Sequence, residues 1–341
     1  MSLYDSQDNT PLLEVKDLRK WFKLRKGFLS KLRYVKAVDG ISFSLEMGKT
    51  LGIVGESGCG KSTLARLLMH LIEIDGGQIN INGRDIAGIR GKTLKNFRKN
   101  MQMIFQDSYA SLNPRMRVGN IIAEPLLIHG ESSAKKRKER VEEMLEIVGL
   151  SKRSFYKFPH EFSGGQRQRI DIARALIFHP QVVICDEAVS ALDVSVQSQI
   201  LNLLKELQER LDLTYIFISH DLSVVRHISD EILVMYLGKT VEKAEKNIFF
   251  KEPLHPYSQT LLSATPQPDP DKKSQQIILS GEVPSPINPP SGCHFHPRCP
   301  VADESCRITE PTLKEVFSGR FASCLKLYEG KKVPLMTGAD T

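Results

Sequence analysis

A glycine-rich motif, GESGCGKS at residues 55–62, constrains the fold of this chain more than any other feature. A short apolar run, residues 51–54, precedes the motif, and the apolar residues after Thr63 follow helical spacing. This strand–loop–helix order is the setting in which GxxxxGK[ST] cradles nucleotide phosphates. The glycines let the backbone wrap an anion, with successive N–H groups pointing inward at it. The sequence therefore predicts a parallel α/β sheet that binds a nucleoside triphosphate.

A second buried strand is predicted at residues 182–185, and two carboxylates follow it at Asp186 and Glu187. Ligands bind at the carboxyl end of a parallel sheet, so both side chains are expected near the phosphates. An acidic pair of this kind can also cap a helix, an alternative that the nearby phosphate loop disfavours. Phosphoryl transfer needs positioning and charge stabilisation more than covalent help. We therefore predict that Asp186 holds Mg²⁺ and that Glu187 polarises the attacking water.

A third motif, SGGQRQR at residues 163–169, indicates which kind of machine uses the nucleotide. Together with the phosphate loop and the acidic pair, it resembles the signature of the ATP-binding cassette (ABC) ATPases. The resemblance implies an α/β fold: a RecA-like P-loop core with an antiparallel β subdomain and an inserted helical subdomain. It also implies that two nucleotide sites form only when two such chains close on each other.

The resemblance assigns roles to further residues. Gln106 matches the family's Q-loop, which senses Mg²⁺ and water, and His220, after the run 215–219, matches its switch histidine. An exposed loop glutamine and a structural histidine are the ordinary alternatives. The signature, Ser163 above all, would face the γ-phosphate held by the opposing chain, with the positive end of its helix. An isolated monomer should therefore hydrolyse ATP poorly.

The implied site residues fall into three groups. Catalysis is assigned to Glu187, His220 and Gln106, and Mg²⁺ to Ser62, Gln106 and Asp186. The nucleotide contacts are Phe22, Gly55, Glu56, Ser57, Gly58, Cys59, Gly60, Lys61, Ser62, Thr63, Asp186, Ser163, Gly164, Gly165, Gln166 and Asp193. Among the aromatic candidates for stacking on adenine, Phe22 is preferred over Trp21 and Tyr34.

Composition and patterning divide the chain into a cassette and an extension. Residues 93–178 are more helical and more charged and are predicted to form the inserted subdomain, while three prolines within residues 265–271 indicate a linker. We predict an ABC ATPase domain at residues 1–262 and a loop-rich extension with four cysteines at residues 263–341. No internal repeat is evident, so one cassette is expected.

Four longer motifs indicate the branch of the family. They lie at residues 106–115, 254–266, 281–286 and 292–300, and each resembles the dipeptide and oligopeptide importer branch. The resemblance implies a heterodimer with a sister ATPase, two transmembrane permease subunits and an extracytoplasmic peptide-binding protein. Three positions depart from the family pattern, namely Ala188, Asp171 and Ser108. None of them removes a catalytic group, although Ala188 could loosen the loop of Glu187.

Four of the six cysteines gather near the C-terminus: Cys293, Cys299, Cys306 and Cys324. Four thiolates in a proline-rich segment suit an iron–sulfur cluster or tetrahedral zinc, although the Cys-x-x-Cys spacing of most zinc sites is missing. Members of the importer branch with this segment carry a [4Fe–4S] cluster, so the resemblance favours that cofactor. Zinc, with His294 or His296 as a ligand, and reduced metal-free cysteines are the alternatives.

Charge and hydropathy set the expected location and partners. The net charge of +7 is spread along the chain, and the basic run at residues 135–140 leads into helically spaced apolar residues, which indicates a solvated helix face rather than a nucleic-acid site. No stretch approaches the ~18–20 apolar residues of a membrane span, and residues 1–17 do not resemble a signal peptide. We expect a peripheral protein on the cytoplasmic face of the bacterial inner membrane, with no nucleic-acid partner.

The function predicted from the sequence is ATP hydrolysis that energises peptide import, with ATP and Mg²⁺ as cofactors. A nickel-chelate or other solute importer is the first alternative, because the binding protein and the permease select the solute. A soluble ABC ATPase of DNA repair or translation is the second. Those proteins usually carry two cassettes or a long coiled-coil insertion, and this chain shows neither.

Overall fold

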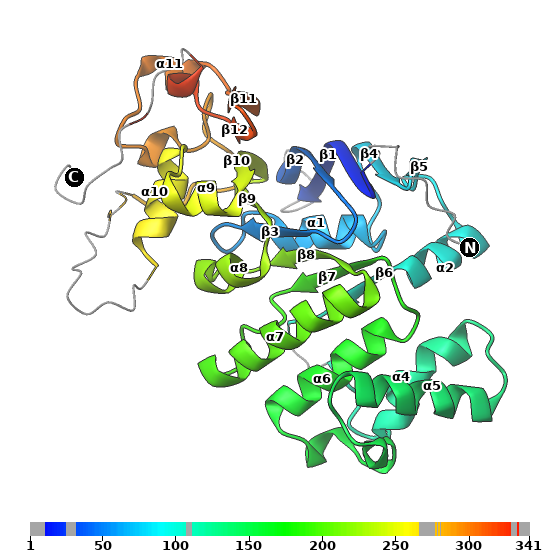
Figure 1. Ribbon diagram of the computed structural model, residues 1–341. Coiled ribbons are helices and arrows are strands. Elements are labelled where there is room, and N and C mark those ends of the chain that lie inside the picture. Colours follow the sequence, from blue (N-terminus) through cyan, green and yellow to red (C-terminus); the bar gives the residue numbers. More distant parts are fainter. Residues whose placement is uncertain are drawn as a thin grey trace.

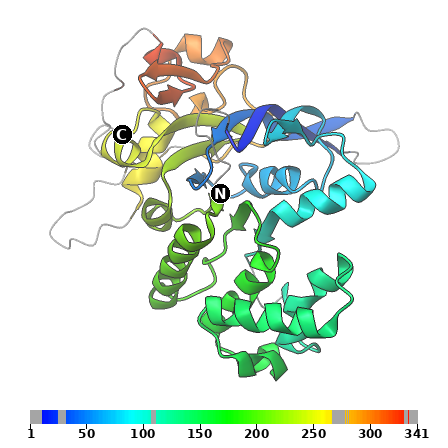
Figure 2. The same ribbon diagram turned by 45° about the vertical axis from the view of Figure 1, so that its right-hand side comes forward.

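The protein is described by a computed structural model covering residues 11–24, 32–106, 111–265, 277, 279, 281–328 and 333. Two β-sheets lie close together in its upper half, and a group of helices projects below them (Figure 1). The view turned by 45° shows the same division, with the C-terminal strands at the top of the picture and the helical arm at the bottom (Figure 2).

The smaller sheet is antiparallel, as the resemblance implies. Its strand order is β2-β1-β4-β5. Apolar partners such as Val15 and Phe43 face each other across β1 and β2, and both are buried against the helix that follows the phosphate loop. Strands β4 and β5 are joined by a hairpin at Asn82-Gly83, and both residues have positive φ, as a tight two-residue turn requires. The bounds are β1 Leu13–Leu24, β2 Arg33–Leu45, β4 Gly76–Ile81 and β5 Arg84–Asp85.

The larger sheet carries the predicted buried strands at its centre. Its order is β11-β12-β10-β9-β3-β8-β7-β6, and neighbouring strands from β9 to β6 are parallel. Successive side chains go to opposite faces, so Tyr215 and Phe217 of β8 pack on one core, and Ile216 and Ile218 on the other. The bounds are β3 Thr50–Val54, β6 Met101–Ile104, β7 Val182–Asp186, β8 Thr214–Ile218, β9 Glu231–Tyr236 and β10 Lys239–Glu245.

Helices cover both faces of this sheet. Helix α1 packs with the small sheet on one face, and α6, α7 and α8 pack on the other (Figure 1). Since each central strand is covered on both sides, its run of apolar residues is continuous rather than alternating. The bounds are α1 Lys61–Leu68, α6 Gly164–Leu176, α7 Val194–Leu211 and α8 Leu222–Ile228.

The helical arm begins later than residue 93. Strand β6 lies inside the range predicted as the helical insert, yet it pairs with β7 in the large sheet. A four-residue strand between helices is too short to interrupt a helical reading of the sequence. Among the described residues between β6 and α6, the elements are α4 Val118–Ile128, α5 Ala134–Ile147 and two short 3₁₀ helices, η1 Lys152–Tyr156 and η2 Pro159–Glu161, while α2 Gly91–Asn100 precedes β6.

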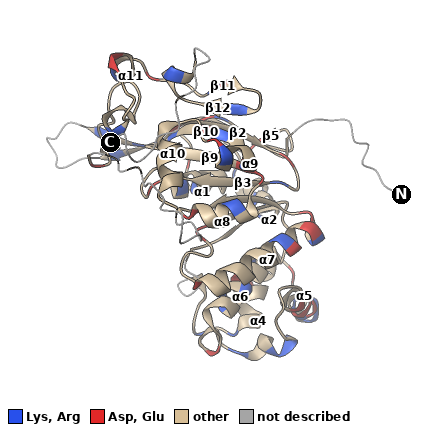
Figure 3. Ribbon diagram, turned by 60° about the vertical axis from the view of Figure 1, so that its left-hand side comes forward, with Lys and Arg blue, Asp and Glu red and all other residues tan. Residues whose placement is uncertain are grey.

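The basic run of residues 135–140 lies on α5, where acidic residues accompany it (Figure 3). Lys135 and Lys138 each form an ion pair four residues further along, with Glu139 and Glu142. The run is therefore a charge-paired face of an arm helix.

The C-terminal region continues the large sheet. Strand β12 pairs with β10 and with β11, so residues far beyond the predicted linker add two strands to the sheet that carries the phosphate loop. Most of the linker, residues 266–271, lies outside the described residues. The remaining bounds are α9 Lys246–Lys251, α10 Pro256–Ser263, η3 His296–Arg298, α11 Glu304–Ile308, β11 Lys314–Phe317, β12 Arg320–Ala322 and η4 Leu325–Leu327.

Candidate nucleotide-binding site

The phosphate loop connects β3 to α1, as the sequence predicts. Gly55, Gly58 and Gly60 all have positive φ. A Cβ at Gly55 would overlap the carbonyl oxygen of Met235, and one at Gly60 would overlap the carbonyl oxygen of Ala37. The glycines thus let the loop turn and also let β2 and β9 approach it closely.

Lys61 lies at the start of α1 with its side chain directed back into the loop. It is 5% exposed, and its ammonium donates to the carbonyl oxygens of Gly55 at 2.7 Å and Glu56 at 3.0 Å. The ammonium also lies 3.7 Å from the Cys59 sulfur. Burial raises the pKa of the Cys59 thiol, with the Lys61 charge opposing the shift. The Lys61 ammonium is therefore held against the loop by two of its carbonyl oxygens.

The carboxylates predicted at the end of β7 are both in place. Asp186 accepts a hydrogen bond from the Ser62 hydroxyl at 3.3 Å, which joins β7 to the phosphate loop. Burial raises the pKa of Asp186, the Ser62 hydrogen bond opposes the shift, and the neighbouring Glu187 carboxylate adds to it. A hydroxyl and a half-buried carboxylate are hard oxygen donors of the kind Mg²⁺ binds.

Glu187 is the point at which three strands' ends meet. The Gln106 side-chain amide, beyond β6, donates to Glu187 Oε2 at 2.8 Å, and His220 Nδ1, beyond β8, lies 3.3 Å from Oε1. Glu187 itself has φ +51°, an uncommon backbone conformation for a residue with a side chain, and its N–H is fixed by the Ile218 carbonyl at 2.9 Å. The strand order β8-β7-β6 explains why these residues, distant in sequence, become neighbours.

A cavity of about 300 Å³ opens beside the phosphate loop. Of the three aromatic candidates for adenine, Phe22 is the one that lines it, and Phe22 is 40% exposed. The Trp21 indole instead donates to Asp39 at 3.0 Å, and Tyr34 packs edge-on against Trp21. The other lining residues are Val35, Ala37, Ser57, Gly58, Gly60, Lys61, Ser62, Thr63, Glu187 and Pro286.

The signature residues begin α6 and are not among those that line this cavity. The Ser163 hydroxyl accepts the Gln166 N–H at 3.4 Å, and the Gln166 side-chain oxygen accepts the Ser163 N–H at 3.1 Å, a reciprocal capping box. Gly165 packs so closely on Val196 that a Cβ would overlap it. Asp193 caps α7 by accepting the Val196 N–H at 2.9 Å, and this bond is the main reason that the pKa of Asp193 is lowered.

The two described departures from the family pattern are accommodated by packing. Ala188 is buried in the core beside Glu187. Asp171, 1% exposed on α6, accepts from Arg174 at 2.5 Å and from the Ser111 hydroxyl at 3.2 Å. A carboxylate at this position thus ties the signature helix to the segment that follows Gln106. The third departure, at residue 108, lies outside the described residues.

The four C-terminal cysteines line one small apolar cavity, together with His296 and Phe295. All four are free thiols. Burial raises the pKa of Cys293 to about 11 and that of Cys299 to about 12, with the neighbouring thiols adding to both shifts. Across the described part of the chain, no three Cys, His, Asp or Glu side chains are close enough around one point to hold a metal ion. The four thiols therefore share one cavity without forming such a group.

Some contacts to the site could not be predicted from motifs read singly. Arg298 and Pro286 come from the C-terminal extension and Tyr257 from α10, just before it, and all three reach the phosphate loop or its cavity. All three lie within or beside the motifs at 254–266, 281–286 and 292–300. Those motifs singled out the right segments but gave no indication that the segments fold back onto the nucleotide site.

No helix among the described residues combines the length and the apolar character needed to cross a membrane.

Comparison with known proteins places these motifs in two family models. The model described as "ABC transporter" matches residues 38–190, and the model described as "Oligopeptide/dipeptide transporter, C-terminal region" matches residues 241–306. The second match includes three of the four clustered cysteines.

Relatives of established name are similar along nearly the whole chain. The dipeptide transport ATP-binding protein DppF of Haemophilus influenzae is 51% identical over 94% of this chain and 98% of its own length. The oligopeptide transport ATP-binding protein AppF of Bacillus subtilis is 53% identical over 92% of this chain and 96% of its own length.

Solved structures with a similar fold include cbiO1 of Clostridium perfringens, part of the ABC transporter complex cbiONQ. It has a TM-score of 0.62 and 26% identity, over 71% of this chain and 91% of cbiO1. The ATP-binding cassette MJ0796, in a dimeric post-hydrolysis state with ADP and Pi, has a TM-score of 0.60 and 27% identity, over 69% of this chain and 98% of MJ0796.

Proposed function

Because this chain belongs to the ABC transporter ATPases of the dipeptide and oligopeptide type, we propose that it hydrolyses ATP to energise peptide import. The observation that carries the proposal is the convergence of Gln106 and His220 on Glu187 beside the phosphate loop. A chain that only bound ATP as a scaffold would have no need to hold a carboxylate in an unfavourable backbone conformation between two polar partners.

ATP would enter the cavity with its phosphates on the loop's N–H groups and its base against Phe22. Lys61 would exchange its two carbonyl partners for the β- and γ-phosphates, a stronger, charge-assisted contact. Thr63 would reach the α-phosphate. Ser62 and Asp186, joined at 3.3 Å, are the side chains that would hold Mg²⁺ with Gln106. The ion, when bound, neutralises charge on the transferring phosphoryl group.

Hydrolysis would centre on Glu187. A water placed between Glu187 and the γ-phosphate gives a proton to the carboxylate while its oxygen bonds to phosphorus and the bond to ADP breaks. Gln106 and His220 fix the carboxylate at 2.8 Å and 3.3 Å, so its lone pairs have a defined direction before ATP arrives. This is positioning rather than covalent catalysis, as phosphoryl transfer requires.

The signature residues would act on a nucleotide held by another subunit. They cap α6 outside the cavity of their own chain, and the helix start offers free N–H groups to an anion. Ser163, Gly164, Gly165 and Gln166 would therefore complete the site of a sister ATPase, with Asp193 at the shared boundary. The dimeric state of the similar cassette MJ0796 supports this arrangement.

The remaining partners follow from the relatives' role in peptide transport. They are two transmembrane permease subunits and an extracytoplasmic peptide-binding protein. The chain would lie on the cytoplasmic face of the bacterial inner membrane and contact the permease near Gln106.

The test is a pull-down of the tagged full chain from its native membrane, with mass spectrometry of the recovered proteins. A sister ATPase, two multi-spanning proteins and a peptide-binding protein support the proposal. Recovery of a nickel-chelate-binding protein would contradict peptide as the transported solute but leave the importer role in place. Recovery of ribosomes or DNA-repair factors without a membrane partner would overturn the transport function.

The recovered complex also tests the chemistry. Glu187→Gln should lower ATP turnover about 10²-fold or more and leave ATP trapped in a closed dimer. Glu209→Gln, which removes an exposed charge from α7, is the matched control and should turn over normally. Normal turnover by the Glu187 variant eliminates it as the catalytic carboxylate.

We further propose that the four cysteines hold a [4Fe–4S] cluster. Four thiols around one cavity supply the four-cysteine donor set that would hold such a cluster. Cys293→Ser should lower the iron and acid-labile sulfide content of anaerobically purified chain, whereas Cys185→Ser, a buried cysteine of β7, should not. Equal iron content in both variants and the parent rules out the cluster.

A further inference from the structure

Arg298, in the C-terminal extension, binds the second residue of the phosphate loop, Glu56. Arg298 places both guanidinium nitrogens on the Glu56 carboxylate, at 2.9 Å and 3.1 Å. The Arg298 side chain is 9% exposed and that of Glu56 is 28% exposed, so water reaches the pair only from one side. A two-pronged, largely buried pair of this kind fixes direction as well as distance.

A second contact holds the backbone of the same residue. The Glu56 N–H donates to the hydroxyl of Tyr257, on α10, at 2.8 Å. Tyr257 is fully buried among Tyr236 of β9 and Phe295, the residue just before η3, with ring centroids 4.7 and 5.4 Å away. Glu56 is therefore held at its side chain by Arg298 and at its backbone by the buried Tyr257.

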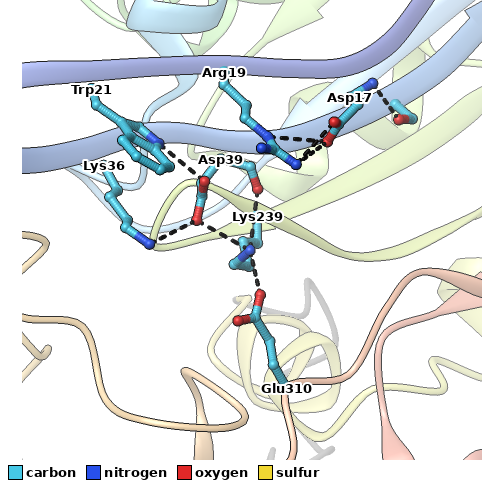
Figure 4. Close-up of polar contacts among 8 residues, drawn as sticks. Asp17, Arg19, Trp21, Lys36, Asp39, Lys239 and Glu310 are labelled. Carbon is cyan, nitrogen blue, oxygen red and sulfur yellow. Dashed lines mark hydrogen bonds and ion pairs between the residues drawn. The ribbon is translucent and has the colours of Figure 1, made fainter. Parts of the chain in front are cut away.

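A third contact reaches the small sheet on the adenine side of the cavity (Figure 4). Lys239 lies between Glu310, at 2.5 Å, and the buried carboxylate of Asp39, at 3.2 Å. Asp39 in turn accepts the Trp21 indole N–H at 3.0 Å. Trp21, the residue before Phe22, is thus linked through Asp39 and Lys239 to Glu310, which lies between Cys306 and Cys324 in the sequence.

The same region forms one wall of the cavity. Pro286 lines it beside Phe22 and the phosphate loop, and its carbonyl accepts the Lys36 N–H at 3.3 Å. The C-terminal region therefore touches the phosphate loop, the adenine side and the space between them.

We infer that Arg298 is a positioning residue for ATP: through Glu56 it holds the phosphate loop in its binding conformation, and the affinity for ATP depends on it. The inference rests on the proposed nucleotide site and adds a determinant outside the cassette motifs. A loop released from Arg298 must be ordered again when ATP binds, at about 1–2 kcal/mol for each residue fixed. One such residue corresponds to roughly a tenfold loss of affinity.

The experiment measures ATP binding by the purified full chain, by equilibrium dialysis with labelled ATP. Arg298→Gln should raise the ATP dissociation constant about tenfold. Arg298→Lys keeps the positive charge but cannot form both hydrogen bonds to Glu56, so its ATP dissociation constant should lie between those of Arg298→Gln and the parent. Arg320→Gln is the control: Arg320 is equally buried and pairs with Glu252 at 3.2 Å, away from the loop, so its loss should leave ATP affinity unchanged.

A double-mutant cycle separates positioning from a general loss of structure. If Arg298 acts through Glu56, then adding Arg298→Gln to Glu56→Gln should change the ATP dissociation constant less than about twofold. A full tenfold effect in that background, or equal affinity of Arg298→Gln and the parent, overturns the inference. A parent chain that binds no ATP contradicts the proposed function instead.

Discussion

Asp171→Ala should lower the free energy of unfolding by about 2 kcal/mol. Deleting one partner of a buried ion pair costs about 3–5 kcal/mol when the other charge is stranded. Arg174 is not fully stranded, since its side chain is 20% exposed and it keeps a 2.7 Å bond to the Ser111 carbonyl. Burial raises the pKa of Asp171, with Arg174 opposing the shift, so removing the carboxylate also relieves some desolvation cost. The remaining hydrogen bond of Arg174 and the relieved desolvation cost both reduce the expected loss of unfolding free energy, from about 3–5 kcal/mol to about 2 kcal/mol.

The assay is thermal or urea unfolding of the nucleotide-free chain. A loss of about 2 kcal/mol corresponds to a fall of roughly 3 °C in Tm for a chain of this length. Arg174→Met tests the same pair from the other side, and the double variant should be little less stable than either single one, because a buried pair replaced as a unit costs little.

Two results would refute this reasoning. One is Asp171→Ala within about 0.5 kcal/mol of the parent, the range of ordinary surface changes. The other is strict additivity of Asp171→Ala and Arg174→Met, which would show that the two side chains are not coupled.

Two further predictions concern stability. His255 caps α10 by accepting the Tyr257 N–H at 3.1 Å, and burial lowers the pKa of His255 to about 3. In the unfolded chain a histidine binds a proton below about pH 6.5. The free energy of unfolding should therefore fall as the pH drops from about 6.5 toward 3, by up to about 1.4 kcal/mol per pH unit. His255→Asn keeps an acceptor at the cap and should flatten that slope in urea titrations from pH 7 to 4.5, whereas an unchanged slope assigns it to other groups. Gly119→Ala should lower the free energy of unfolding by about 1–3 kcal/mol, because the added Cβ would overlap the Phe155 ring. Gly88→Ala is the control, and its unfolding free energy should be close to that of the parent because the space around Gly88 is open.

The convergence of Gln106 and His220 on Glu187 was predictable from the sequence because it obeys a general rule. The buried apolar runs before Gln106, Asp186 and His220 identify parallel strands, and the carboxyl ends of such strands meet at one side of the sheet. The strand order then brings Gln106 and His220 onto Glu187. Local pattern and topology agree here.

The grip on Glu56 could not be predicted in the same way. Arg298 and Glu56 lie 242 positions apart, and no periodicity in either segment indicates which loop packs on which. The start of the helical insert was placed too early for a different reason, since the charged helix α2 precedes β6 and its sequence already has a helical pattern. The strands β11 and β12 are short and sit in a segment whose prolines and cysteines predict loops.

The pairing of β12 with β10 has a consequence for how the protein is made. Strand β10 leaves the ribosome about 80 residues before Ala322, which pairs with Glu242, so at 5–20 residues per second it waits roughly 4–16 s for its neighbour. During that interval its outer row of backbone N–H and C=O groups is an open template for another nascent chain. Strands β11 and β12 therefore cover this edge of β10 once they are synthesised. A chain truncated before residue 320 should be prone to aggregation even though every motif for ATP is already present.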